Sequence, residues 1–92
     1  MAGGQNTFEW DEANRSHIAR HGVTPEEFEQ GMANPVFVGQ YEIHGEVRTR
    51  VAATTDRGRL LELVYTMRHG SIRAVTAFPL KKNKRGLYSW PA

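Results

Sequence analysis

Arginines recur in this chain at spacings that place several of them on one surface of a β-sheet. Arg48 and Arg50 are two residues apart in a segment typical of a strand, so their side chains point to the same side. Arg59 and Arg68 lie at the two ends of the next apolar segment, and Arg73 lies within the last one. A guanidinium donates two parallel hydrogen bonds, a geometry that fits phosphate oxygens. The pattern predicts a cationic surface for RNA or DNA; alternatively, these side chains only keep an exposed sheet soluble.

Two of the four histidines could also do chemistry. His17 and His21 are four residues apart in a predicted helix, so they share one side of it. That spacing suits two zinc ligands, but the glutamate of the HExxH motif and a third ligand are missing, so we expect no metal. His21, beside Arg20, is a candidate general acid or base, with a structural role as the alternative. His44 and His69 precede glycines and are expected to be turn residues.

Composition excludes several classes of protein. The chain has 92 residues and no cysteine, which excludes disulfide frameworks, thiolate metal sites and cysteine nucleophiles. No apolar run reaches the roughly 18 residues of a membrane span. The glycine patterns of nucleotide-binding loops and the GxSxG pattern are absent. Residues 1–6 lack the features of a signal peptide and are expected to be a flexible tail. We expect one cytoplasmic domain over residues 7–92, without a cofactor.

Charge is distributed unevenly along the chain. Residues 1–47 carry two arginines and eight acidic residues, a net charge of −6, whereas residues 48–92 carry ten Lys or Arg and two acidic residues, a net charge of +8. This asymmetry favours a polyanionic partner for the second half. The alternative is that the two halves pack together and neutralise each other. The residues predicted to bind RNA outside the catalytic centre are Arg50, Arg68, Lys81, Lys82, Lys84 and Arg85.

Helix signals dominate the first third of the chain, and strand signals dominate the rest. Residues 7–10 alternate polar and aromatic types, as a short strand would. Asp11 is a predicted N-cap for a helix reaching about residue 21, and a capping box at Thr24 starts a second helix that ends before Pro35. Four apolar segments rich in β-branched residues follow, separated by turns that end in glycine: Val36–Ile43, Val47–Ala53, Leu60–Met67 and Ile72–Phe78.

These elements predict an α+β domain. Two N-terminal helices would pack on one face of a four-stranded antiparallel sheet, with a short helix at the C-terminus. The arginines would then occupy the opposite, open face, because unpaired arginines are almost never buried. On the last strand, strict alternation would place Arg73 on the open face and Ile72, Ala74 and Thr76 on the helix face.

An ordered series of motifs in this chain resembles one known family, the BrnT toxins of bacterial type II toxin–antitoxin systems. The similarity covers about residues 7–90 and rests on Phe8-Glu-Trp-Asp11, Asn14, Arg20-His-Gly-Val23, Pro35, Gly45-Glu46, Arg48, Arg57-Gly-Arg-Leu-Leu61, Val64-Tyr-Thr66, Ile72-Arg73 and Tyr88. The resemblance implies a RelE-like fold, a ribonuclease activity that blocks translation, and a BrnA-like antitoxin as partner. It also implies that promoter DNA is contacted only indirectly, through the antitoxin.

Two positions depart from the pattern of that family. Arg20 stands where the family typically carries a lysine, and Phe78 stands where it carries an arginine of the active site. Pro79 follows and cannot donate a ladder hydrogen bond, so the strand is expected to end there. Two interpretations therefore stay open: an active ribonuclease, or a catalytically weak module that binds the antitoxin and takes part in repressing its own operon. A third is an RNA-binding domain of another purpose.

The mechanism expected of an active enzyme needs no metal, because RNA supplies its own nucleophile, the 2′-OH. The protein must then hold the phosphate, stabilise its developing charge and move protons. Arg48, Arg59 and Arg73 would hold the phosphate, while His21 or Tyr88 would assist proton transfer. The products would carry a 2′,3′-cyclic phosphate and a 5′-hydroxyl. The residues predicted to be catalytic are Arg20, His21, Arg48, Arg59, Arg73 and Tyr88.

Overall fold

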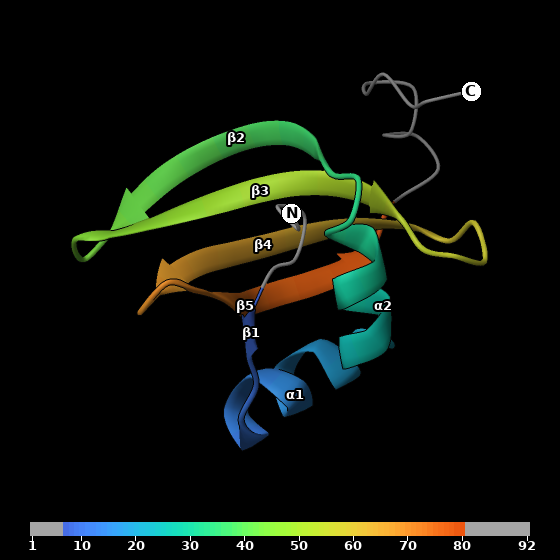
Figure 1. Ribbon diagram of the computed structural model, residues 1–92, viewed down its shortest axis with the longest axis horizontal. Coiled ribbons are helices and arrows are strands. Elements are labelled where there is room, and N and C mark those ends of the chain that lie inside the picture. Colours follow the sequence, from blue (N-terminus) through green and yellow to red (C-terminus); the bar gives the residue numbers. More distant parts are fainter. Residues whose placement is uncertain (1–6, 81–92) are drawn as a thin grey trace.

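The computed structural model describes residues 7–80, which form two helices and one five-stranded sheet (Figure 1). The elements in chain order are β1 (Phe8–Glu9), α1 (Glu12–Ala19), α2 (Pro25–Gly31), β2 (Val36–Ile43), β3 (Glu46–Thr54), β4 (Leu60–Arg68) and β5 (Ser71–Pro79). The expected N-terminal tail and C-terminal helix lie outside the described residues, as do Lys81, Lys82, Lys84, Arg85 and Tyr88.

Both helices start at the residues that the sequence indicates. The Asp11 carboxylate accepts a hydrogen bond from the Asn14 N–H, and the Asn14 side chain accepts one from the Asp11 N–H. Thr24 and Glu27 form the same reciprocal pair at the start of α2. Each pair satisfies two N–H groups that a helix start leaves without partners. α1 ends at Ala19, two residues earlier than predicted. None of the described helices is long and apolar enough to cross a membrane.

The sheet has the order β1-β5-β4-β3-β2, with three antiparallel hairpin pairings from β2 to β5. β1 adds a fifth strand, parallel to β5, with Phe8 opposite Ile72. The prediction of a four-stranded, fully antiparallel sheet was therefore wrong in this detail. The cause is the free edge of β5, where the Ile72 N–H donates to the Thr7 carbonyl at 2.8 Å. A two-residue strand has no sequence pattern that reveals such a pairing.

The core lies between the helices and one face of the sheet. Ile18 of α1 and Phe28 of α2 are fully buried and belong to one cluster with Leu61 and Leu63 of β4. α2 comes close to the sheet at Gly31, where an added Cβ would lie 2.9 Å from a Leu63 side-chain carbon and from the Ala53 Cβ. Only glycine fits this contact without movement of the sheet. This packing fixes α2 against β3 and β4.

A β-bulge in β5 changes the predicted assignment of its faces. Val64 pairs with Thr76 and Tyr65 pairs with Ala74, so Val75 is an extra residue in the ladder. Neighbouring residues of β4 point to opposite faces, and Ala74 and Thr76 therefore do so as well. Ala74 is buried in the core, as expected. The prediction that Thr76 shares its face was wrong, because strict alternation does not continue through a bulge.

The face of the sheet turned away from the core carries four arginines: Arg48, Arg50, Arg68 and Arg73. We call it the arginine face. Its centre is less open than predicted, since Glu62 and Thr66 of β4 are only 2% and 3% exposed. α1 lies at the edge of the sheet formed by β5 and β1 (Figure 1), so one side of α1 packs into the core while another borders the arginine face. The edge of the sheet thus brings α1 next to the arginines.

Candidate functional site

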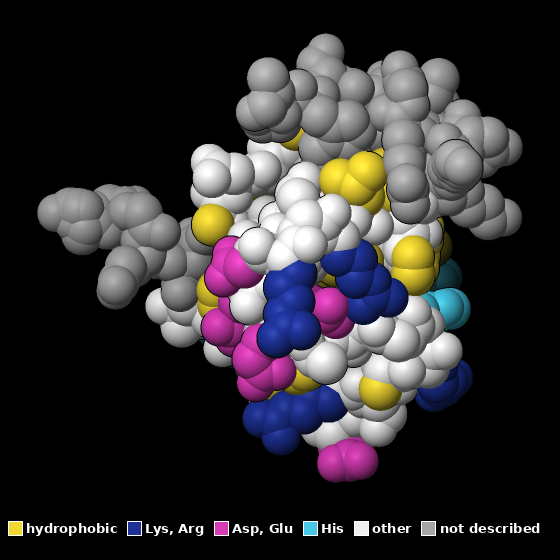
Figure 2. Space-filling view, turned by 90° about the vertical axis from the view of Figure 1, so that its right-hand side faces the viewer, with side chains coloured by type: hydrophobic (Ala, Val, Ile, Leu, Met, Phe, Trp, Pro, Cys, Tyr) yellow, Lys and Arg dark blue, Asp and Glu magenta, His cyan; other side chains and the backbone are white. Residues whose placement is uncertain are grey.

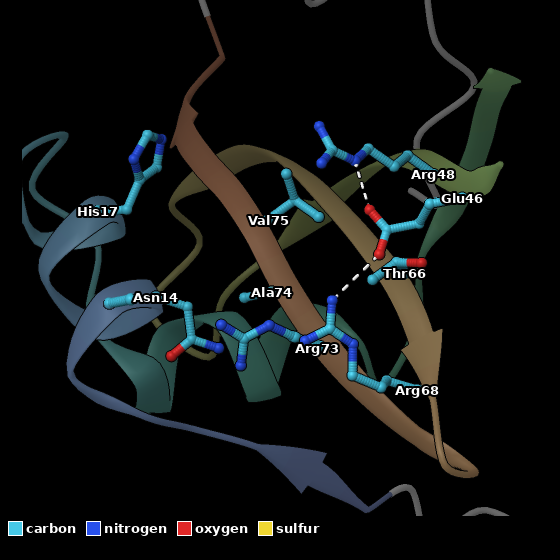
Figure 3. A pocket seen from close by; sticks show the side chains of 10 residues that line it. Asn14, His17, Glu46, Arg48, Thr66, Arg68, Arg73, Ala74 and Val75 are labelled. Atoms are coloured by element: carbon cyan, nitrogen blue, oxygen red, sulfur yellow. Dashed lines mark hydrogen bonds and ion pairs between the residues drawn. The ribbon is translucent and has the colours of Figure 1, made fainter. Parts of the chain in front are cut away.

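A pocket of about 300 Å³ lies on the arginine face, between α1 and the strands β3, β4 and β5 (Figure 3). Three of the predicted arginines line it: Arg48, Arg68 and Arg73. Their side chains share the pocket with two groups that can exchange protons, the carboxylate of Glu46 and the imidazole of His17. Cations, a carboxylate and a histidine thus meet in one cavity that is large enough for a small anionic group.

Glu46 joins two of the arginines. Its Oε1 accepts a hydrogen bond from Arg48 Nε at 2.9 Å, and its Oε2 accepts one from Arg68 Nη2 at 3.2 Å. The bond from Arg48, reinforced by Arg68, holds the pKa of the Glu46 carboxyl below its ordinary value, against the opposing effect of burial. Glu46 in turn raises the pKa of Arg48. The carboxylate is therefore ionised at neutral pH and keeps both guanidiniums directed at one point.

Arg73 combines a place in the pocket with a structural task. Its Nη1 lies 2.7 Å from Asp11 Oδ2 and 3.4 Å from Glu9 Oε2, and its side chain is 16% exposed. The hydrogen bond from Arg73 is the main cause of the lowered pKa of the Asp11 carboxyl, followed by the bond from the Asn14 backbone. Since Asp11 caps α1, Arg73 ties β1 and the start of α1 to β5.

His17 borders the pocket from α1. Its Nε2 lies 3.1 Å from Thr76 Oγ1, the hydroxyl that the bulge brings onto this face. This contact fixes the orientation of the imidazole ring across the interface between helix and sheet. His21, the histidine predicted to be catalytic, is exposed; its ring centre lies 5.7 Å from that of His17 and 6.1 Å from that of Phe78. The lining of the pocket includes His17 and not His21.

Arg59 lies elsewhere, in the loop before β4 and on the helix side of the molecule. Its Nη1 donates to the Gly22 carbonyl at 2.8 Å and to both oxygens of the Glu27 carboxylate at 3.0 Å. Burial raises the pKa of Glu27, but the bonds from Thr24 and Arg59 outweigh it and leave the pKa below its ordinary value. Figure 2 shows cationic and acidic side chains interspersed on this side of the molecule.

Two further predicted residues of the described part, Arg50 and Arg20, do not line the pocket. Arg50 neighbours it on the arginine face, where its Nε donates to Glu62 Oε2 at 2.8 Å. Arg20 is the exposed C-cap residue of α1. The structure thus brings Arg48, Arg68 and Arg73 together, and leaves Arg20, His21, Arg50 and Arg59 outside the pocket.

Two titratable residues that line the pocket, Glu46 and His17, were not among the predicted site residues, and each had a signal in the sequence. Glu46 precedes Arg48 by two residues, so strand alternation already places both on one face. His17 follows Asn14 by three residues, which places both on one side of α1. Thr76, which contacts His17 but does not line the pocket, had no such signal, because the bulge that turns it toward His17 depends on the pairing of β4 with β5. Within the described residues, no group of three or more His, Cys, Asp or Glu side chains is placed to hold a metal ion.

Comparison with known proteins identifies the family. Residues 10–83, most of the chain, match the family model described as the ribonuclease toxin BrnT of a type II toxin–antitoxin system. A comparison with curated proteins finds no significant match. The motifs that resemble this family include Gly45-Glu46 and Arg48, which form part of the pocket and its adjoining turn. The chain therefore belongs to the BrnT family of ribonuclease toxins of type II toxin–antitoxin systems.

Proposed function

We propose that this toxin is a metal-independent endoribonuclease that cleaves RNA in the pocket on the arginine face. One observation carries the proposal: Arg48 and Arg68 converge on a single carboxylate at 2.9 and 3.2 Å. A point where two guanidiniums hold one anion also suits the oxygens of a phosphate. The ion pairs involved are partly exposed, so exchanging the carboxylate for a phosphate costs little.

In this mechanism the 2′-OH of the RNA attacks the neighbouring phosphate. Arg48 and Arg68 hold the non-bridging oxygens and stabilise the charge that develops on them, with Arg73 adding positive charge from β5. The products carry a 2′,3′-cyclic phosphate and a 5′-hydroxyl. Arg20 and Arg59 have no place in this step, because neither lines the pocket.

The biological role that fits this reaction is inhibition of translation in the cytoplasm, neutralised by a BrnA-like antitoxin. An acidic segment of such an antitoxin would compete with RNA for Arg48 and Arg68, so one set of cations would serve both inhibition and catalysis. Promoter DNA would be bound only through the antitoxin. The RelE-like character of the fold and the identity of the antitoxin belong to this proposal, and rest on the resemblance to the family.

A second candidate function is binding without turnover. It is favoured by Phe78, which stands at the position where the family carries an arginine and whose ring lies beside that of His21, with centres 6.1 Å apart. An apolar ring there provides no charge for a phosphate. A chain of this kind would keep the antitoxin complex and its role in repressing the operon, and would leave RNA intact.

Incubation with RNA in excess EDTA separates these two functions. The protein is purified free of antitoxin, its folding is checked by circular dichroism, and product ends are identified by enzymatic labelling. The proposal predicts cleavage in EDTA, with cyclic-phosphate and 5′-hydroxyl ends. Intact RNA with a folded sample favours the binding function, and activity that returns only with magnesium contradicts the metal-independent mechanism.

A further inference from the structure

Two groups in the pocket are able to exchange protons and have no role in holding the phosphate. Figure 3 shows Glu46 projecting from β3 on one side of the pocket and His17 projecting from α1 on the other, with β5 between them. In-line displacement at phosphorus needs a proton acceptor at the attacking oxygen and a proton donor at the leaving oxygen, on opposite sides of the phosphate. The arrangement of Glu46 and His17 matches this requirement.

The position of Glu46 follows from its partners. Each carboxylate oxygen accepts one hydrogen bond from an arginine, at 2.9 Å from Arg48 and 3.2 Å from Arg68. Any phosphate that these arginines hold is therefore next to this carboxylate. The side chain is 28% exposed, which leaves it accessible from the pocket.

The position of His17 follows from a different contact. Its Nε2 lies 3.1 Å from the Thr76 hydroxyl, and the residue is partly buried between α1 and β5. A ring held by a neighbouring hydroxyl loses little freedom when a substrate binds, which favours a precise proton transfer. Histidine is also the side chain that titrates closest to neutral pH, so it can donate a proton there.

We propose that Glu46 is the general base and His17 the general acid of the cleavage reaction, an inference that rests on the proposed ribonuclease function. The Glu46 carboxylate takes the proton of the 2′-OH as the bond between the 2′-oxygen and phosphorus forms. The bond between phosphorus and the 5′-oxygen breaks, and the leaving oxygen takes a proton from the His17 imidazolium. After the product with the cyclic phosphate leaves, Glu46 releases its proton to water and His17 takes one from water, which restores both protonation states.

Substrate binding makes Glu46 a better base. In the free protein, the hydrogen bond from Arg48 is the main reason that the pKa of Glu46 is low. A phosphate takes over hydrogen bonds of Arg48 and Arg68 and brings its own negative charge, and both changes raise the pKa of a neighbouring carboxyl. The carboxylate therefore gains proton affinity when RNA arrives.

The charged and titratable groups around the pair define the pH dependence. Glu46 faces Arg48 on β3 and Arg68 on β4, both charged throughout the accessible pH range. His17 faces His21 on its own helix, and Arg73 of β5 lines the same pocket. The rate of cleavage is therefore expected to rise with deprotonation of Glu46 at low pH and to fall with deprotonation of His17 at higher pH.

The test uses Glu46→Gln and His17→Gln in the full chain, measured on a short RNA in EDTA. Each variant is expected to lower kcat by about 100-fold or more, the usual contribution of a positioned acid or base. Glu46→Gln should leave KM unchanged or lower it, because it removes a negative charge that competes with the phosphate. It should also remove the acidic limb of the pH profile, whereas His17→Gln should remove the basic limb. Glu42→Gln on β2 and His69→Asn in the last turn are matched controls that should retain wild-type rates.

A second substrate separates the acid from the base. An RNA with sulfur in place of the bridging 5′-oxygen has a leaving group that needs no proton, because a thiol has a pKa near 8.5. His17→Gln should cut this substrate at nearly the wild-type rate, and Glu46→Gln should not. If wild type cuts RNA while both variants stay within about threefold of it, this inference is wrong and the ribonuclease function stands. A folded wild type that cuts neither substrate overturns both.

Discussion

Arg59 and the pair Arg48–Arg68 are bound to glutamates in similar ways, yet they stand in contrasting surroundings. At both sites the distances between nitrogen and oxygen lie between 2.9 and 3.2 Å. Arg59 also donates to the Gly22 carbonyl, and its partner Glu27 completes the capping box of α2. Glu46 caps no helix and lines the pocket that also contains Arg68, Arg73 and His17. Glu27 lines a different pocket, in which the lining arginine is Arg57. The length of an ion pair therefore does not distinguish Arg59 from the arginines proposed to bind a phosphate. The other hydrogen bonds of Arg59 and of Glu27 do.

The contrast also has an energetic side. Removal of Arg59 takes one hydrogen-bond donor from the Gly22 carbonyl and one from the Glu27 carboxylate, which keeps its bond from the Thr24 N–H. This loss destabilises the fold. The ion pairs of the pocket are partly exposed, and such pairs contribute at most about 1 kcal/mol each. The proposed exchange of Glu46 for a phosphate at the pocket arginines would therefore cost little free energy, whereas the same exchange at Arg59 would also break its bond to the Gly22 carbonyl.

The largest expected effect separates the two sites by activity. Arg48→Ala combined with Arg68→Ala should lower the rate of RNA cleavage by roughly 100-fold or more, because both donors to the developing charge are lost. The free energy of unfolding should change by no more than about 2 kcal/mol, because each of the two lost ion pairs contributes at most about 1 kcal/mol. Cleavage of a labelled RNA and urea unfolding followed by circular dichroism measure the two quantities. Arg15→Ala, at an exposed arginine of α1, is the control. A double variant that still cuts RNA at the wild-type rate would contradict the proposed role of Arg48 and Arg68.

A smaller effect is expected at the structural site. Arg59→Ala should lower the free energy of unfolding by about 1–2 kcal/mol, since hydrogen bonds to a carbonyl and a carboxylate are lost. The cleavage rate per folded molecule should stay within about twofold of wild type. Arg57→Ala, two residues earlier in the same loop, controls for changes in net charge. Loss of cleavage by a fully folded Arg59 variant would restore this residue to the reaction, as the sequence predicts.

The smallest effect concerns pH. The folded-state pKa of Glu27 lies below its ordinary value of 4.5, so its stabilising contribution is complete above that pH and is lost as the pH falls through the folded-state pKa. Arg59 causes part of this lowering. The stability deficit of Arg59→Ala should therefore be largest at neutral pH and shrink at pH 3, as measured by urea unfolding at both values. A stability deficit of the same size at both pH values would show that the ion pair between Arg59 and Glu27 does not cause it.

Much of the fold follows from the sequence, because its signals are local. The caps at Asp11 and Thr24 and the apolar strands separated by glycine turns all depend on neighbouring residues, and the structure has them close to the predicted positions. The parallel pairing of β1 and the bulge at Val75 were missed. Both depend on contacts between segments that are distant in the sequence, Phe8 with Ile72 and Val64 with Thr76.

The candidate site was predictable only in part. Alternation correctly placed Arg48 and Arg73 on one face of the sheet, and the pocket contains both. Strand alternation could not show that Arg59 lies apart from the other arginines, because its side chain extends from the loop before β4 toward the helices. The role of His21 in proton transfer stays a prediction. The position of α1 at the sheet edge brings His17, and not His21, into the lining of the pocket. Whether an arginine or a histidine belongs to the pocket thus depends on the partners of its side chain rather than on its residue type.

The most direct test of the central claim observes the arginines themselves. The Nε–H group of Arg48 donates to Glu46, and its NMR signal reports any exchange of that partner. Titration with a short RNA whose 2′-OH at the scissile position is replaced by hydrogen avoids cleavage. If RNA binds in the pocket, the Nε–H signals of Arg48 and Arg68 should shift saturably, with the signal of Arg59 unchanged. Shifts confined to Arg59, with Arg48 and Arg68 unmoved at saturation, would contradict binding in the pocket.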